Sequence, residues 1–149
     1  MHALFEDLYA RLADLHGDIK NALDGLPPEA LDWVPGPNMN SLTVLVIHTT
    51  GAERYWIGQM AGGDPVDRVR AEEFKAEALN VATLVERLDE TLAHSQRTLE
   101  SLTLEDLETV RLHNEKEYRA AWSLLHALEH TAVHVGHIQM IRQLWDQRF

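Results

Sequence analysis

The sequence contains no cysteine. Disulfides, thiolate nucleophiles and cysteine-ligated zinc are therefore excluded, and any metal ion has to be bound through histidine, aspartate or glutamate. Long apolar runs are missing as well, since none approaches the roughly 20 residues that a membrane-spanning helix needs. The first residues also lack the basic and apolar regions of a secretory signal. We therefore expect a cytoplasmic protein without a membrane partner.

Positive charge is scarce. The chain has 13 Lys and Arg residues against 24 Asp and Glu residues, which gives a net charge of −11. Such a charge repels the phosphates of nucleic acids, so we expect no nucleic-acid partner. The length of 149 residues is typical of one domain, and the 45% of apolar residues is enough for one core. A single domain over residues 1–149 is predicted.

Apolar residues recur at helical spacing in four long segments. Predicted helices cover approximately residues 1–25, 42–61, 80–100 and 119–147. Asn40-Ser41 offers an N-cap for the second of them. The stretch 65–77 is charged and weakly patterned, so we expect a solvated connection there, at most a lid. The segment 107–117 has no clear period. Four long helices with loop-like connections predict an all-α protein, a four-helix bundle.

The histidines of the last predicted helix carry the strongest chemical signal. At about 100° per residue, His134 points into the apolar face and His130 lies at its edge, whereas His126 and His137 lie on the flank. His130 and His134 are four residues apart, a spacing that suits two ligands of one ion. A third ligand has to come from another helix, and His48 is the one histidine of the second predicted helix. We predict a divalent metal bound by His48, His130 and His134, with an open coordination position as in catalytic zinc sites.

Glu53 is the carboxylate of most interest, because it falls within the apolar arc of the second predicted helix. It is a candidate catalytic base or a hydrogen-bond partner of the metal site. The alternative is an ordinary glutamate that reaches solvent or pairs with Arg142 on the last helix. The HExxH motif of metalloproteases and the paired Glu-x-x-His motifs of di-iron bundles are absent.

Taken together, these residues resemble the DinB/YfiT-like superfamily across nearly the whole chain. The resemblance rests on Ser41-Leu42, His48, Glu53-Arg54-Tyr55-Trp56 and the run Leu125-His126-Ala127-Leu128-Glu129-His130-Thr131-Ala132-Val133-His134-Val135-Gly136. It implies a four-helix bundle with a mononuclear site, usually zinc or nickel, and places the ligands on His48, His130 and His134. After the glycine, many relatives carry glutamine where this chain has His137.

The resemblance also implies a function. Similar proteins include low-molecular-weight thiol S-transferases and a mycothiol-dependent isomerase. We therefore expect a metal-dependent enzyme that activates a thiol such as bacillithiol or mycothiol for attack on a small-molecule electrophile. The alternatives are a metal-dependent hydrolase with Glu53 as a base, or a non-catalytic, stress-linked binding protein whose metal ion only stabilises the bundle. The resemblance further implies a homodimer.

Overall fold

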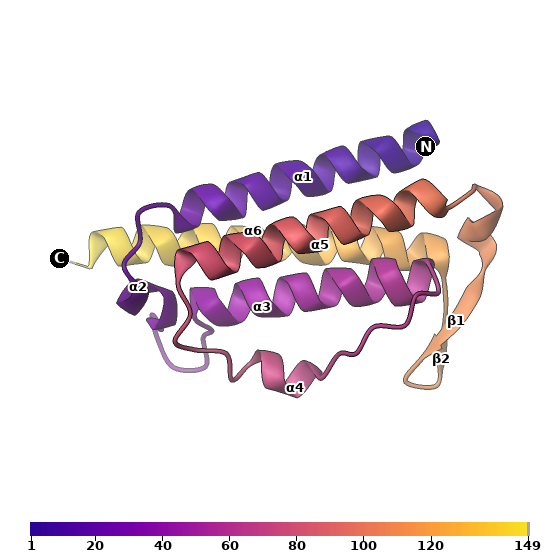
Figure 1. Cartoon of the computed structure of the whole chain (residues 1–149). Coiled ribbons are helices and arrows are strands. Elements are labelled where there is room, and N and C mark those ends of the chain that lie inside the picture. The colour runs from indigo at the N-terminus through magenta and orange to yellow at the C-terminus, as the bar shows by residue number, and fades with distance from the viewer. Residues whose placement is uncertain (149) are drawn as a thin grey trace.

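The computed structural model describes residues 1–148, so Phe149 of the predicted domain lies outside the described part. Four long helices dominate it (Figure 1): α1 (Ala3–Leu23), α3 (Leu42–Glu53) continued by η1 (Arg54–Ala61), α5 (Val81–Ser101) and α6 (Ala120–Gln147). The shorter elements are α2 (Pro28–Asp32), α4 (Arg70–Glu73), the 3-10 turn η2 (Glu105–Glu108) and the strands β1 (Val110–His113) and β2 (Lys116–Arg119). The predicted all-α four-helix bundle is confirmed.

The second long helix begins where the sequence predicts but changes its form along its length. The Ser41 side chain accepts a hydrogen bond from the backbone N–H of Val44 at 3.1 Å, which caps α3. After Glu53 the chain continues as the π-helix η1, which ends with Gly62 donating to the carbonyl of Ile57 at 2.9 Å. A π-helix is wider than an α-helix and frequently adjoins a functional site.

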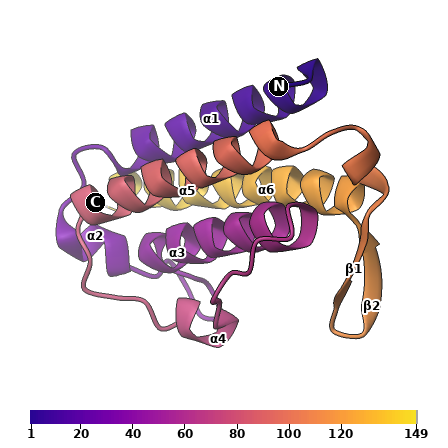
Figure 2. The same ribbon diagram turned by 45° about the vertical axis from the view of Figure 1, so that its right-hand side comes forward.

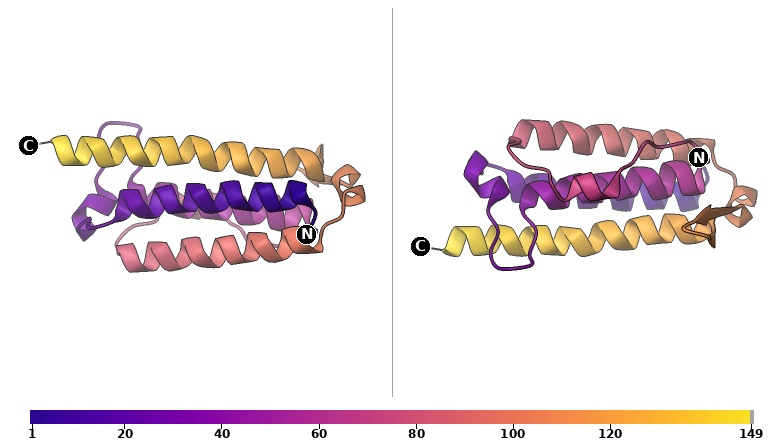
Figure 3. Two further views of the ribbon diagram at one scale, coloured as in Figure 1. Left: turned by 90° about the horizontal axis from the view of Figure 1, so that it is seen from above. Right: turned by 90° about the horizontal axis from the view of Figure 1, so that it is seen from below.

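The order of the helices around the bundle explains its longest connection. α1 packs against α5 and α6, and α3 packs against the same two helices, so α1 and α3 lie on a diagonal. α3 and α5 run in the same direction, and the chain has to return along the bundle between them (Figures 1 and 2). Residues 62–80, which we call the connector, make this return over α3 and include α4 (Figure 3).

Two groups of buried apolar side chains fill the bundle. Near α2 they include Ile19, Leu31, Leu42, Leu84, Leu88 and Ile138. Near the hairpin they include Phe5, Leu12, Ile57, Met60, Leu99 and Ala127. Within residues 1–148, no helix combines the length and the apolar character needed to cross a membrane.

The segment 107–117, in which apolar residues follow no clear helical or strand period, contains part of a β-hairpin. β1 and β2 pair antiparallel, and the turn between them is formed by Asn114 and Glu115 with φ angles of 49° and 66°. Two central residues with positive φ are typical of the type I′ turn that suits a two-residue hairpin. The hairpin brings His113 and Tyr118 against Trp56 of η1.

Candidate metal centre

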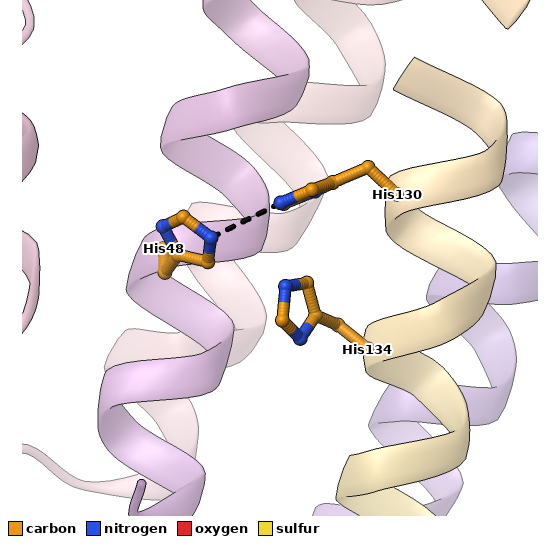
Figure 4. Close-up of side chains that lie close together, drawn as sticks. All are labelled: His48, His130 and His134. Carbon is orange, nitrogen blue, oxygen red and sulfur yellow. Dashed lines mark hydrogen bonds between the residues drawn. The ribbon is translucent and has the colours of Figure 1, made fainter. Parts of the chain in front are cut away.

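Three imidazoles converge between α3 and α6 (Figure 4). His48 comes from α3, and His130 and His134 come from successive turns of α6. Their candidate ligand atoms all lie within 4.8 Å of one another. Nε2 of His48 is 3.0 Å from Nε2 of His130, and one ring nitrogen of His134 points toward the gap between them (Figure 4). The structure thus brings together the three histidines singled out in the sequence.

The spacing of two of the three imidazoles fits two ligands of a zinc-type ion. Two nitrogen ligands of a tetrahedral zinc ion, each about 2.0–2.1 Å from the metal, lie roughly 3.4 Å apart. The separation of 3.0 Å between His48 and His130 is close to this value. An all-nitrogen set of three neutral donors leaves at least one coordination position for a water molecule or a substrate.

The electrostatics of the cluster keep two of the imidazoles neutral. Burial lowers the pKa of His130 to about 3, and the neighbouring His134 and His48 add to the effect. Burial likewise lowers the pKa of His134 to about 4, together with His48 and His137. Because only the neutral ring ligates a metal, protons compete weakly for these two nitrogens at neutral pH.

A carboxylate lies directly behind His48. Glu73 accepts a hydrogen bond from Nδ1 of His48 at 3.0 Å, which leaves the lone pair of Nε2 facing His130. Arg68 donates two further hydrogen bonds of 2.9 Å to this carboxylate. Burial raises the pKa of Glu73, but these hydrogen bonds outweigh it and hold the pKa below its usual value. A Cβ at Gly51 would come within 2.0 Å of Glu73, so a residue without a side chain lets the carboxylate approach α3.

The prediction for the connector missed Glu73. The stretch 65–77 was expected to be a solvated connection, yet Glu73 is buried at the end of α4. The sequence offers Glu72, Glu73 and Glu77 within six residues of the same charged segment. No apolar period distinguishes the buried carboxylate from its exposed neighbours, so the pattern could not single it out.

The two flanking histidines border the cluster. Nδ1 of His137 lies 3.2 Å from Nδ1 of His134, where it can fix the orientation of that ring. His126 stacks on Trp122 with ring centroids 4.7 Å apart and an interplanar angle of 13°. The His126 ring lies 5.8 Å from that of His130. Neither flanking histidine is needed to complete the group of three converging rings.

Aromatic rings continue from His126 toward the hairpin and form what we call the aromatic wall. It consists of Tyr55, Trp56, His113, Tyr118, Trp122 and His126. Trp122 is 43% exposed, so part of the wall faces solvent. Tyr55 donates a hydrogen bond to Nδ1 of His113 at 2.7 Å, and burial raises the pKa of its phenol. Such a surface beside a metal centre suits a planar or apolar group of a ligand.

Glu53 lies in the centre of the bundle, away from Arg142. One carboxylate oxygen is 2.7 Å from Nε2 of His16, and the other accepts from the Ser95 hydroxyl at 2.7 Å. Nδ1 of His16 is in turn 3.2 Å from the carbonyl of Leu88. Arg142 donates instead to two carbonyls at the end of α1, so the expected pairing with Glu53 is wrong. A role for Glu53 as a base stays a prediction, and it would require the carboxylate to leave His16 or Ser95.

The chain is similar to a known protein family and to several solved structures. A family model described as mycothiol-S-transferase matches residues 7–147. Comparison with curated protein sequences gives no significant match. Among solved structures, YfiT from Bacillus subtilis, described as a probable metal-dependent hydrolase with an unusual four-helix bundle topology, is similar with a TM-score of 0.79. Its sequence identity is 12%, and the match covers 98% of this chain and 90% of YfiT.

Two further structures share the fold. A DinB-like protein from Bacillus subtilis matches with a TM-score of 0.72 and 16% identity, over 95% of this chain and 92% of its own. The mycothiol-dependent maleylpyruvate isomerase matches with a TM-score of 0.67 and 12% identity, over 90% of this chain but only 60% of its own. At these identities, the structures establish a common bundle topology.

Proposed function

This chain belongs to the mycothiol-S-transferase family, and on that premise we propose that it transfers a low-molecular-weight thiol to an electrophilic small molecule with the help of one divalent metal ion. The observation that carries the proposal is the convergence of His48, His130 and His134, three imidazole donors without a fourth protein ligand among residues 1–148. Zinc or nickel suits such an imidazole set. The predicted DinB/YfiT-like resemblance is confirmed by the family match and by the shared fold.

The chain itself supplies no thiol, because it has no cysteine. When bound, a divalent ion lowers the pKa of a coordinated thiol and so supplies the nucleophilic thiolate near neutral pH. Glu73 fixes the tautomer and orientation of the His48 ring through its hydrogen bond to Nδ1. The aromatic wall provides a surface against which an apolar electrophile can stack next to His130. In the proposed transfer, the sulfur forms a bond to the electrophilic carbon as the bond between that carbon and a leaving group breaks. The leaving group departs with the electron pair of the broken bond, and the thiol proton is released to solvent.

The test compares metal-loaded and chelator-treated protein in the conjugation of a chromogenic electrophile. Mycothiol, bacillithiol and free cysteine serve as parallel thiol substrates. We expect a metal-dependent acceleration with at least one of the two larger thiols and little with cysteine. Equal background rates for all thiols, with and without metal, would refute the transferase proposal.

Hydrolysis is the second candidate function, supported by the description of YfiT and by the open coordination expected at three histidines. In that case the metal ion activates a water molecule instead of a thiol. Turnover of an ester or amide in the absence of any thiol would favour this candidate. If the metal ion only stabilises the bundle, neither reaction is expected.

Three further predictions from the sequence stay predictions: the single domain over residues 1–149, the cytoplasmic location and the homodimer.

The contact between Glu73 and His48 leads to a quantitative prediction. We expect Glu73→Gln to weaken metal binding about 10- to 100-fold, because a neutral amide no longer holds the Nδ1 proton of His48 as strongly. Competition with a chromogenic chelator measures the affinity. The matched control is Glu72→Gln, since Glu72 is exposed and its carboxylate accepts a hydrogen bond from Lys75 at 3.0 Å. Equal affinities for both variants would show that Glu73 does not support the site.

A further inference from the structure

A cavity of about 600 Å³, with several charged residues in its lining, lies beside the candidate metal centre. It is bounded by α3 and η1, by the connector and by α5, whereas the three histidines come from α3 and α6. Arg54 of η1 and Arg87 of α5 are among its lining residues. Arg68 and Glu73 also line it, and their ion pair separates the cavity from His48.

Two guanidinium groups in this cavity have no carboxylate partner among the described residues. Nε of Arg54 is fully buried and makes no hydrogen bond within residues 1–148. Arg87 donates from Nε to the hydroxyl of Thr50 at 2.7 Å, and no ion pair involving it is formed in this part of the chain. Burial lowers the pKa of Arg87, and the nearby positive charge of Arg54 lowers it further. The carboxylates of Glu73 and Glu90 oppose this effect, but the pKa stays below its usual value. Two like charges therefore face the same partly enclosed space.

Within residues 1–148, no carboxylate around the cavity forms an ion pair with Arg54 or Arg87. Glu73 is already engaged by Arg68. The other three lining carboxylates belong to exposed residues at the rim: Asp64, Asp67 and Glu72. The chain has 24 acidic residues, so carboxylates are abundant in it. Partly buried guanidiniums that nevertheless stay unpaired are costly unless an anion joins them.

We propose that this cavity binds a small oxyanion, the carboxylate or phosphate group of a small molecule, between Arg54 and Arg87. The planar guanidinium presents paired N–H donors that match the oxygens of such a group, and both Arg54 and Arg87 line the cavity. The cavity is large enough to hold more of the ligand than its charged group. This site lies outside the three-histidine cluster and goes beyond the proposed transfer reaction.

The test titrates the full-length, metal-loaded protein with inorganic phosphate and, separately, with succinate, by isothermal calorimetry at constant ionic strength in chloride. We expect saturable binding of at least one probe, and the stronger of the two identifies the anionic group. Arg54→Gln and Arg87→Gln should each weaken it about tenfold or more, as expected for the loss of a charged hydrogen-bond donor. Arg97→Gln is the matched control, because Arg97 is exposed on the same helix as Arg87 and does not line the cavity.

Two further measurements locate the bound anion. Metal-free His130→Ala protein should still bind the probe, since the cavity does not require the ion; loss of binding there would place the anion on the metal and overturn the proposal. Circular dichroism verifies that each variant is folded, and Arg87→Lys replaces Arg87→Gln if the latter does not fold. The proposal is also overturned if neither probe binds saturably. The same holds if Arg97→Gln weakens binding as much as Arg54→Gln and Arg87→Gln do.

Discussion

Replacing His130 with alanine is expected to empty the metal centre. The side chain provides one of three converging nitrogens, and its Nε2 lies 3.0 Å from Nε2 of His48. Only two protein ligands are then left for a zinc or nickel ion, whereas catalytic zinc sites use three. Elemental analysis after purification and dialysis should fall from about one ion per chain to almost none. His48→Ala and His134→Ala should have the same effect.

The flanking histidines provide the matched controls. His126→Ala and His137→Ala remove rings that touch the cluster without completing it, so both proteins should still copurify with metal. Their affinity should fall by no more than about 10- to 100-fold. If either variant empties the site while His48→Ala leaves it filled, the ligand set is wrong and another helix has to supply the third donor.

Removal of the Glu53 carboxylate should cost a large part of the free energy of unfolding, which is about 5–15 kcal/mol for a typical domain. Glu53→Ala leaves His16 without its partner at the centre of the bundle, where both residues are only 1% exposed. Breaking a buried pair in this way costs about 3–5 kcal/mol in the free energy of unfolding. Urea unfolding followed by circular dichroism measures the loss.

Two further variants serve as controls for the stability of Glu53→Ala. Glu90→Ala, at an exposed position of α5, should change the free energy of unfolding by less than about 0.5 kcal/mol. The double variant His16→Leu/Glu53→Leu should recover part of the loss, because apolar residues of similar volume often replace a buried pair without a penalty. A Glu53→Ala protein as stable as the wild type would contradict the role of this pair. Retention of full hydrolytic activity by Glu53→Gln would remove Glu53 as a base.

The helical period of the sequence was sufficient to predict which histidines face the interior of the bundle. α6 is a continuous α-helix over residues 120–147, so the angular positions calculated from the sequence hold along its length. The same period is less reliable in the second helix, because the chain changes to a π-helix after Glu53 and each later residue turns by a smaller angle. The apolar arc assigned to the whole second predicted helix, residues 42–61, therefore assumes a regularity that the molecule lacks.

The features that the sequence did not indicate depend on contacts between distant segments. The turn at Asn114-Glu115 lacks the Asn-Gly signal of most type I′ turns, so the hairpin has only a weak local signature. Glu53 meets His16 across the bundle, 37 residues away, and no spacing rule relates positions on diagonal helices. The closure of Glu73 onto His48 depends on the path of the connector, which carries no apolar period.

The parallel course of α3 and α5 also sets a minimum length for the chain between them. α5 has 21 residues and so spans about 31 Å. Roughly ten residues in an extended conformation cover that distance. The connector has 19 residues, so nearly half of its length is in excess of what the crossing requires. Part of that excess is folded into the turn of α4 that ends at Glu73. A connector shortened toward the minimum would still join the two helices, but it would no longer have enough chain to bring a carboxylate to His48.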